Sequence, residues 1–252
     1  MELKIDGLCI QAQPGQTLLQ MIEQLGLGGE SLSTIPIAAK IAGEVFNLNY
    51  VPVRPQDVQQ ERSSIRRAML ASGGVINLIR YTDPAGRDVY DRTVQFVIFL
   101  ALHRLCPNAF VKMNCTVGRA LYVDVRDDVF CVDTLKREVS SLIEQNIPLI
   151  RKRITTKEAI AQFAKQGKTD KARLLSWRTE EYFDIYSYED FADYYYGELA
   201  PSTGYIKVWD IIPADGVSCS YILMINAPIP LQYIMKCQTS STFIKRASVG
   251  VS

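Results

Sequence analysis

The first 26 residues constrain the fold of the amino-terminal region more than any other stretch. Residues 2–5 alternate charged and apolar side chains, Asp6-Gly7 follows, and a second largely apolar run covers residues 8–12. Asp-Gly between two such runs predicts a β-hairpin, because both residues tolerate the positive φ of a tight turn. Apolar residues then recur at helical spacing from Leu18 to Leu25 and stop at Gly26, which predicts a helix.

Two short strands are predicted after this helix. Residues 35–52, IPIAAKIAGEVFNLNYVP, place Ala42-Gly43-Glu44 between two apolar runs. The order hairpin, helix and short strands is that of a β-grasp fold, and we expect this domain to cover residues 1–81. Residues 54–74 form a charged insert, which we interpret as a helix that ends at the glycine pair, with a flexible insert as the alternative.

The remaining chain, residues 82–252, predicts a second domain of α+β type. A strand is expected at 75–81, just before this domain. The domain's own expected elements are a turn at 83–86, a buried helix at 94–105, a strand at 118–128, helices at 132–146 and 155–167, and strands at 205–212 and 218–225. The last two strands are expected at the edges of a mixed sheet. Thr155 and Glu158 have the spacing of a capping box, and Gly167 is the expected end of that helix.

Composition narrows the classes of function. Lys plus Arg number 28 and Asp plus Glu 27, so no overall positive field favours nucleic acid or acidic lipid, although short basic clusters occur at 62–67 and 150–153. Six cysteines without a CxxC pair are typical of reduced, packed thiols. No signal peptide or membrane-spanning run is visible, so we expect a cytoplasmic protein without a membrane partner.

Two resemblances fit this order of elements. Residues 14–22, PGQTLLQMI, and 38–48, AAKIAGEVFNL, resemble the ubiquitin-like TGS domain of threonyl-tRNA synthetases and certain GTPases. The motifs YTDPAGRDVYDRT, LCPNAFVKM, GRALYVDV and YEDFADYYYGELA resemble the editing domain of threonyl-tRNA synthetases. The resemblance implies an α+β fold and, in that family, a metal-ligand set of His-x-x-x-His and Cys-x-x-x-His.

This chain departs from the family at all four ligand positions. By the resemblance they fall on Arg92 and Phe96, and on Tyr195 and Leu199. His103 is the only histidine of the chain, so no site with two or three histidines can form. We therefore expect no metal site and no catalytic residue in this chain.

Phosphate-binding motifs are also missing. Gly167-Lys168-Thr169 spells the end of a P-loop, but the required first glycine would fall on Gln162, and we interpret the three residues as the end of a helix. No other nucleotide-binding or nucleophile motif is present.

A third resemblance concerns the whole arrangement. A TGS domain followed by an editing-like domain with tyrosines at the ligand positions is similar to the amino-terminal half of bacterial uridine or nucleoside kinases. It implies a non-catalytic regulatory or ligand-binding module of an ATP-dependent kinase, whose catalytic domain is absent from this chain. ATP and Mg²⁺ are then expected only for that missing kinase domain, and no cofactor is expected for this chain. The kinase domain would be a partner of this module. Whether the whole protein is an enzyme is left open.

The segment DYYYGELAPSTGY, residues 193–205, is the candidate site. One interpretation is a packed aromatic cluster that has lost its metal. The other is a pocket for a nucleoside, a nucleotide or RNA, in which tyrosines stack on a base. The residues proposed to bind this ligand are Arg92, Phe96, Tyr194, Tyr195, Tyr196, Ser202, Thr203 and Tyr205. The alternative function is a tRNA-binding or trans-editing protein related to threonyl-tRNA synthetase.

Overall fold

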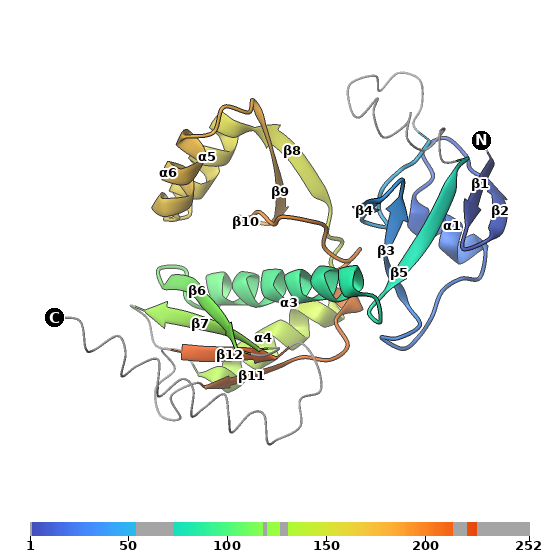
Figure 1. Ribbon diagram of the computed structural model, residues 1–252. Coiled ribbons are helices and arrows are strands. Elements are labelled where there is room, and N and C mark those ends of the chain that lie inside the picture. The colour runs from blue at the N-terminus through green and yellow to red at the C-terminus, as the bar shows by residue number, and fades with distance from the viewer. Residues whose placement is uncertain (1, 54–72, 118–119, 127–130, 214–220, 226–252) are drawn as a thin grey trace. The chain divides into compact units, whose positions relative to one another are not determined.

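The computed structural model describes residues 2–53, 73–117, 120–126, 131–213 and 221–225 (Figure 1). The predicted helix within residues 54–74 lies outside the described residues, apart from the two glycines. The chain divides into two compact units, one made of residues 1–93 and 147–205, the other of residues 94–146 and 206–252. The domain boundary predicted between residues 81 and 82 stays a prediction.

The amino-terminal part of the first unit is a β-grasp module. Its five-stranded sheet has the order β2-β1-β5-β3-β4, in which β1 and β5 are parallel and the other neighbours antiparallel. The strands are β1 (Glu2–Ile5), β2 (Leu8–Gln11), β3 (Pro36–Ile41), β4 (Glu44–Phe46) and β5 (Val75–Arg80). The helix α1 (Leu18–Gln24) buries Leu18, Met21 and Ile22 in a common core with the sheet.

Local chemistry produces the turns of this module as expected. Asp6 and Gly7 have φ of 44° and 91°, which confirms the predicted hairpin. Ala42 and Gly43 have φ of 50° and 89° between β3 and β4. Thr17 caps α1 and forms a reciprocal capping box with Gln20.

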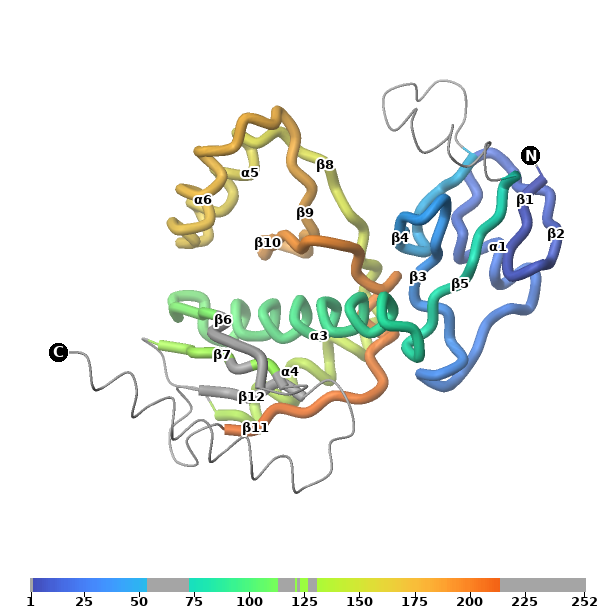
Figure 2. The backbone as a smooth tube through the Cα atoms, in the orientation of Figure 1, coloured from blue at the N-terminus to red at the C-terminus, as the bar shows by residue number. Residues whose placement is uncertain are grey.

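The same unit contains a second, smaller sheet covered by two helices. The antiparallel strands β8 (Arg151–Thr155), β9 (Tyr182–Tyr188) and β10 (Phe191–Asp193) have the order β10-β9-β8. Between β8 and β9 the chain forms α5 (Thr156–Lys165) and α6 (Thr169–Ser176), which Figure 2 traces as one continuous yellow segment. The predicted capping box of Thr155 and Glu158 is confirmed at the start of α5.

The interpretation of residues 167–169 as the end of a helix was incomplete. Gly167, with φ of 70°, follows α5, but Thr169 already begins α6 and Lys168 is its N-cap residue. The Lys168 ammonium donates to the carbonyl of Ala192 at 2.7 Å and lies 4.1 Å from the centre of the Phe191 ring. The Lys168 ammonium is therefore bound by other residues of this chain.

The helix α3 (Pro84–Leu105) runs from the first unit into the second. Its residues from Val94 to Leu102 are buried except Gln95 and Phe99, which are half-buried, so the predicted buried helix is confirmed. It begins ten residues earlier than predicted, at Pro84, so most of the turn predicted at 83–86 is wrong because Pro84 and Gly86 belong to the first turn of the helix. The second unit also contains α4 (Val132–Glu144), which buries Leu135, Val139 and Leu142 as its helical spacing predicts.

The sheet of the second unit is antiparallel, so the expected mixed sheet is wrong. Its order is β11-β12-β7-β6, with β6 (Phe110–Val117), β7 (Ala120–Arg126), β11 (Asp210–Pro213) and β12 (Tyr221–Ile225). β12 lies inside the sheet and pairs with both β11 and β7. The strand predicted at 205–212 begins only at Asp210, since residues 203–205 form a 3-10 helix and residues 206–209 belong to neither a helix nor a strand. The α+β class with an amino-terminal β-grasp domain is confirmed.

Candidate functional site

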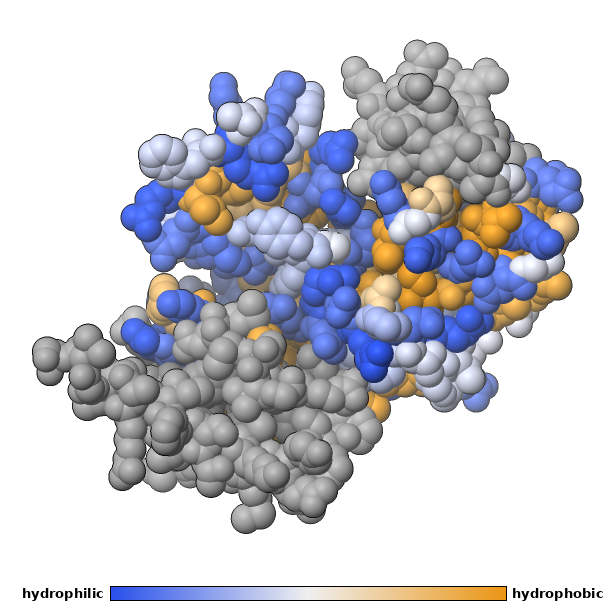
Figure 3. Space-filling model, in the orientation of Figure 1, coloured by the Kyte–Doolittle hydropathy of each residue, from blue (hydrophilic) through white to orange (hydrophobic). Residues whose placement is uncertain are grey.

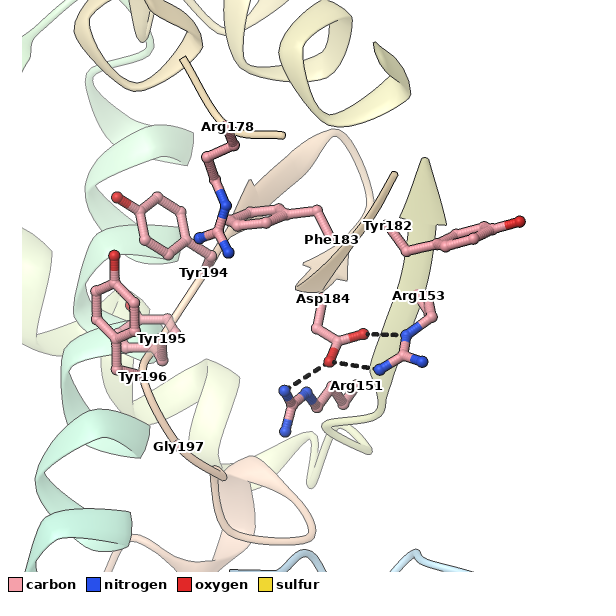
Figure 4. Close-up of a pocket in the computed structure, with 10 residues that line it drawn as sticks. All are labelled: Arg151, Arg153, Arg178, Tyr182, Phe183, Asp184, Tyr194, Tyr195, Tyr196 and Gly197. Carbon is pink, nitrogen blue, oxygen red and sulfur yellow. Dashed lines mark hydrogen bonds and ion pairs between the residues drawn. The ribbon is translucent and has the colours of Figure 1, made fainter. Parts of the chain in front are cut away.

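A surface hollow of about 420 Å³ lies in the first unit and is called here the Arg–Tyr pocket. Three arginines, one aspartate, five aromatic residues and one glycine line it: Arg151, Arg153, Arg178, Asp184, Tyr182, Phe183, Tyr194, Tyr195, Tyr196 and Gly197. Figure 4 shows Asp184 beside Arg151 and Arg153, with Phe183 and Tyr194 close to Arg178. The strands β8 and β9 and the segment after β10 supply most of these residues.

Strand geometry gathers the charged groups of the pocket. Arg151 and Arg153 are two positions apart on β8 and therefore project from the same face. Asp184 lies opposite Arg153 on β9. Its carboxylate accepts from Arg151 at 2.6 Å and from Arg153 at 2.9 and 3.3 Å. Burial alone would raise the pKa of Asp184, but the hydrogen bonds from both arginines outweigh burial and lower it.

A buried network continues from Arg151 beneath the pocket. Its guanidinium donates to the Glu198 carboxylate at 2.7 Å, and the Tyr186 hydroxyl donates to the second Glu198 oxygen at 2.6 Å. The Glu198 side chain is only 7% exposed. Burial opposes a charge on Arg151, yet the Glu198 carboxylate outweighs burial and raises the pKa of Arg151. Burial and then Glu198 raise the pKa of Tyr186. The network therefore contains a charged arginine and a neutral phenol.

The three consecutive tyrosines have different surroundings. The Tyr194 ring meets Phe183 edge-on at 5.1 Å and Tyr196 at 5.8 Å. Tyr195 meets the buried ring of Tyr186 at 6.5 Å, whereas Tyr196 is 80% exposed. Burial raises the pKa of Tyr194 and, more strongly, the pKa of Tyr195. These two phenols therefore stay neutral near pH 7, and Tyr196 alone of the three presents most of its ring to solvent.

The other predicted site residues do not line the Arg–Tyr pocket. Arg92 donates to the Glu198 carbonyl at 3.1 Å and adjoins Gly197, where an added Cβ would lie 2.8 Å from the guanidinium carbon. The Thr203 hydroxyl accepts from the Ile147 amide at 2.9 Å, and Ser202 is buried. Burial, then Glu23, raises the pKa of Tyr205 to about 12. Phe96 is fully buried in the second unit. Ligand binding by these residues stays a prediction.

A second charged cluster lies next to Tyr194. Asp193, whose side chain is 3% exposed, binds Lys171 at 2.5 Å and has Lys168 at 3.8 Å. The Lys171 ammonium lies 5.4 Å from the centre of the Tyr194 ring. Burial lowers the pKa of Lys168 to about 8, with Lys171 acting in the same direction and Asp193 opposing them. Sequence reasoning missed this cluster because α6 was not predicted.

The residues Arg151, Arg153, Arg178, Asp184 and Glu198 were also missed as site residues. The sequence did show a basic cluster at 150–153, and the alternation of Arg151 and Arg153 was the signal available. Nothing in the sequence linked that cluster with Tyr194, 43 positions further along the chain.

Neither a metal cluster nor a membrane span is found in the described part of the chain. No group of three or more His, Cys, Asp or Glu side chains there could hold a metal ion. Among the same residues, no helix is sufficiently long and apolar to cross a membrane.

Comparison with known proteins identifies threonine–tRNA ligases among the relatives of this chain. No model of a known protein family matches the chain. It is 23% identical over 219 residues to the threonine–tRNA ligase of Symbiobacterium thermophilum. The aligned region makes up 84% of this chain and 30% of that protein. The enzymes of that name from Acetivibrio thermocellus and Desulforamulus reducens are 24% and 25% identical over 216 residues, covering 84% of this chain and 31% of theirs.

These relatives support the resemblance to a synthetase TGS and editing region. The chain spans less than a third of the length of each of these relatives. They favour the tRNA-related alternative over the kinase interpretation, for which the comparisons give no support.

Proposed function

We propose that this chain binds an unpaired RNA end, such as the end of a tRNA, in the Arg–Tyr pocket without hydrolysing it. The observation that carries the proposal is the combination of three arginines with exposed aromatic rings in one hollow. The relatives add support, since the name threonine–tRNA ligase identifies tRNA as a substrate of those enzymes. Their similarity extends over 84% of this chain.

Each part of the pocket fits one part of a nucleotide. Arginine guanidinium groups recognise phosphate through paired hydrogen bonds, and the lining residues carry three positive charges against one negative charge. Tyr196 and Tyr182 are 80% and 53% exposed, which leaves ring faces on which bases can stack. Trp177, 82% exposed, directly precedes Arg178 in the chain. Stacking of this kind requires bases that are not already paired in a duplex.

The surface around the pocket is compatible with a polyanion. Hydrophilic residues dominate the visible face over α5 and α6 in Figure 3. Arg178 keeps its guanidinium 5.2 Å from the Phe183 ring centre and donates to Glu180 at 3.1 Å. Glu180 lies at the surface, so its carboxylate can exchange this contact for water when a phosphate approaches Arg178.

Hydrolysis is not expected from this pocket. A deacylase needs a base or a metal-bound water, and the tyrosines Tyr194 and Tyr195 hold their protons near pH 7. By the resemblance to the synthetase editing domain, the metal-ligand positions of that family fall on Arg92, Phe96, Tyr195 and Leu199. An aminoacyl-tRNA deacylation assay should therefore show no turnover above the uncatalysed rate.

Fluorescence anisotropy with a labelled single-stranded RNA and with a whole tRNA tests the proposal. We expect binding that weakens as salt increases, because phosphates displace counterions when arginines bind them. Tyr196→Ala should weaken it about 5- to 150-fold, whereas Tyr196→Phe keeps the ring and should retain affinity. Phe110→Ala is a matched control, since Phe110 is 45% exposed in the other unit.

Three results would contradict the proposal. They are the absence of RNA binding, equal losses in Tyr196→Ala and Phe110→Ala, and binding that requires duplex RNA. Direct binding of uridine or ATP at millimolar concentration in the Arg–Tyr pocket, without RNA binding, would instead favour the regulatory module of a nucleoside kinase.

A further inference from the structure

A loop of residues 198–203, which follows the Arg–Tyr pocket, depends on side chains of the β-grasp module. We call these residues the 198–203 loop. Its carbonyl groups are buried with their residues and lie outside the named strands, so they need donors from elsewhere in the chain. Asn47, which follows β4 and is 6% exposed, supplies one such donor.

Asn47 makes three contacts across the sequence. Its Nδ2 donates to the carbonyl oxygens of Leu199 at 2.8 Å, Ala200 at 3.2 Å and Leu149 at 3.3 Å. Its Oδ1 accepts from the Asn49 backbone amide at 2.7 Å. Both the nitrogen and the oxygen of the Asn47 side-chain amide therefore have hydrogen-bond partners, which fix the orientation of the amide.

Asn49 extends the same junction by one residue. Its Nδ2 donates to the Pro201 carbonyl at 2.8 Å and to the Leu149 carbonyl at 3.4 Å. Pro201 also accepts from the Leu149 amide at 2.9 Å. Two asparagines of the β-grasp module thus bind three consecutive carbonyls of the 198–203 loop.

Other groups of the loop are bound by residues outside the β-grasp module. The Ala200 amide donates to the Thr93 hydroxyl at 2.8 Å, and the Leu199 amide donates to the Tyr186 hydroxyl at 3.2 Å. Glu198, the first residue of the loop, binds Arg151 and Tyr186 through its carboxylate. The residue whose carboxylate holds Arg151 is thus the chain neighbour of Leu199, whose carbonyl accepts from Asn47.

We propose that Asn47 is a positioning residue of the Arg–Tyr pocket, which makes the β-grasp module a structural part of the binding site. Asn47 fixes Leu199 and Ala200, these residues fix Glu198, and Glu198 directs the Arg151 guanidinium. By thermodynamic reciprocity, a ligand held by Arg151 strengthens the junction between the β-grasp module and the 198–203 loop. The identity of that ligand rests on the proposed function, whereas the positioning does not.

The test compares Asn47→Asp with Asn77→Asp in the full chain. Aspartate keeps the size of asparagine but places an oxygen against three carbonyls, whereas Asn77 lies exposed on β5 of the same module. Hydrogen exchange of the amides in residues 198–203 should accelerate about tenfold or more in Asn47→Asp, while β1, β3 and β5 keep their protection. Asn49→Asp, at a half-buried position, is the milder second variant and should accelerate the same amides less.

RNA binding provides the second readout. In Asn47→Asp we expect an affinity about tenfold lower and a weaker dependence on salt, with the slope of log K against log salt falling by about 0.7 as one phosphate contact is lost. A purely structural loss of stability would lower the folded fraction and leave that slope unchanged.

The outcomes separate this inference from the proposed function. If the wild-type chain binds no RNA, the proposed function fails, but exchange in residues 198–203 still decides the positioning. Equal exchange in Asn47→Asp and Asn77→Asp would overturn the inference. The inference would also be overturned if hydrogen exchange in β1, β3 and β5 accelerated as much as in the 198–203 loop, in both Asn47→Asp and Asn49→Asp.

Discussion

Arg151 joins two acidic side chains, and replacing it with methionine tests the network beneath the Arg–Tyr pocket. The substitution leaves Glu198, 7% exposed, with the Tyr186 hydroxyl as a donor but without its cation. Removing one partner of a buried ion pair costs about 3 to 5 kcal/mol. The Arg151 side chain is 30% exposed, so solvent screens part of the interaction, and we expect a loss of about 2 to 3 kcal/mol.

Urea denaturation followed by circular dichroism measures this loss. With a slope of about 2 kcal/mol per molar urea, the midpoint should fall by about 1 M without a change in slope. Arg153→Met is the matched control on the same strand, because Asp184 then keeps Arg151 as a partner, and it should cost less than about 1 kcal/mol.

The double variant Arg151→Met with Glu198→Gln isolates the cause. Glutamine still accepts a hydrogen bond from Tyr186 but carries no charge, so the double variant should be more stable than Arg151→Met alone. If Arg151→Met costs no more than Arg153→Met, or if the double variant is the less stable one, the reasoning about a buried unpaired carboxylate is refuted.

Three further predictions concern other positions. Lys168 has a pKa of about 8 in the folded chain, whereas its ordinary value is 10.5. Between these pH values Lys168 is therefore protonated to a greater extent in the unfolded chain than in the folded chain. Wild-type stability should therefore rise by about 3 kcal/mol from pH 8 to pH 10.5 relative to Lys168→Met, and equal urea midpoint shifts in both proteins would contradict this. Gly86→Ala would place a Cβ 1.9 Å from the Arg80 carbonyl oxygen and should lower the unfolding free energy by about 3 kcal/mol, whereas Gly28→Ala meets no atom within 4 Å and should change it little. Thr155→Ala removes the capping box of α5 and should cost about 1 kcal/mol in thermal unfolding, while an unchanged Tm would show that the cap contributes nothing.

Thiol chemistry was only partly predictable. The sequence favoured cysteines packed as small apolar residues, and Cys106 at the end of α3 is buried as expected. Cys9 and Cys131, however, are exposed. Composition alone cannot place a thiol, because burial depends on which face of an element meets a core.

Elements whose signals are local were predictable. The Asp6-Gly7 turn, the helices α1 and α4 and the capping box of α5 depend on residues within a few positions of one another. The strands β8 and β9 were missed for the opposite reason. Three of the five residues of β8 are charged, so no apolar alternation marks it, and its pairing with β9 is made with residues about 30 positions away.

The sequence by itself determined the β-grasp order and the α+β class, and its single histidine excludes a metal site with two or three histidines. Each of these follows from residue identity or from short-range periodicity. Only the tertiary structure brought Arg151, Arg153 and Arg178 to Tyr194 and Tyr196, and placed Asn47 against the 198–203 loop. These contacts join residues between 16 and 153 positions apart, and such pairings are decided by how sheets and helices bury their apolar faces.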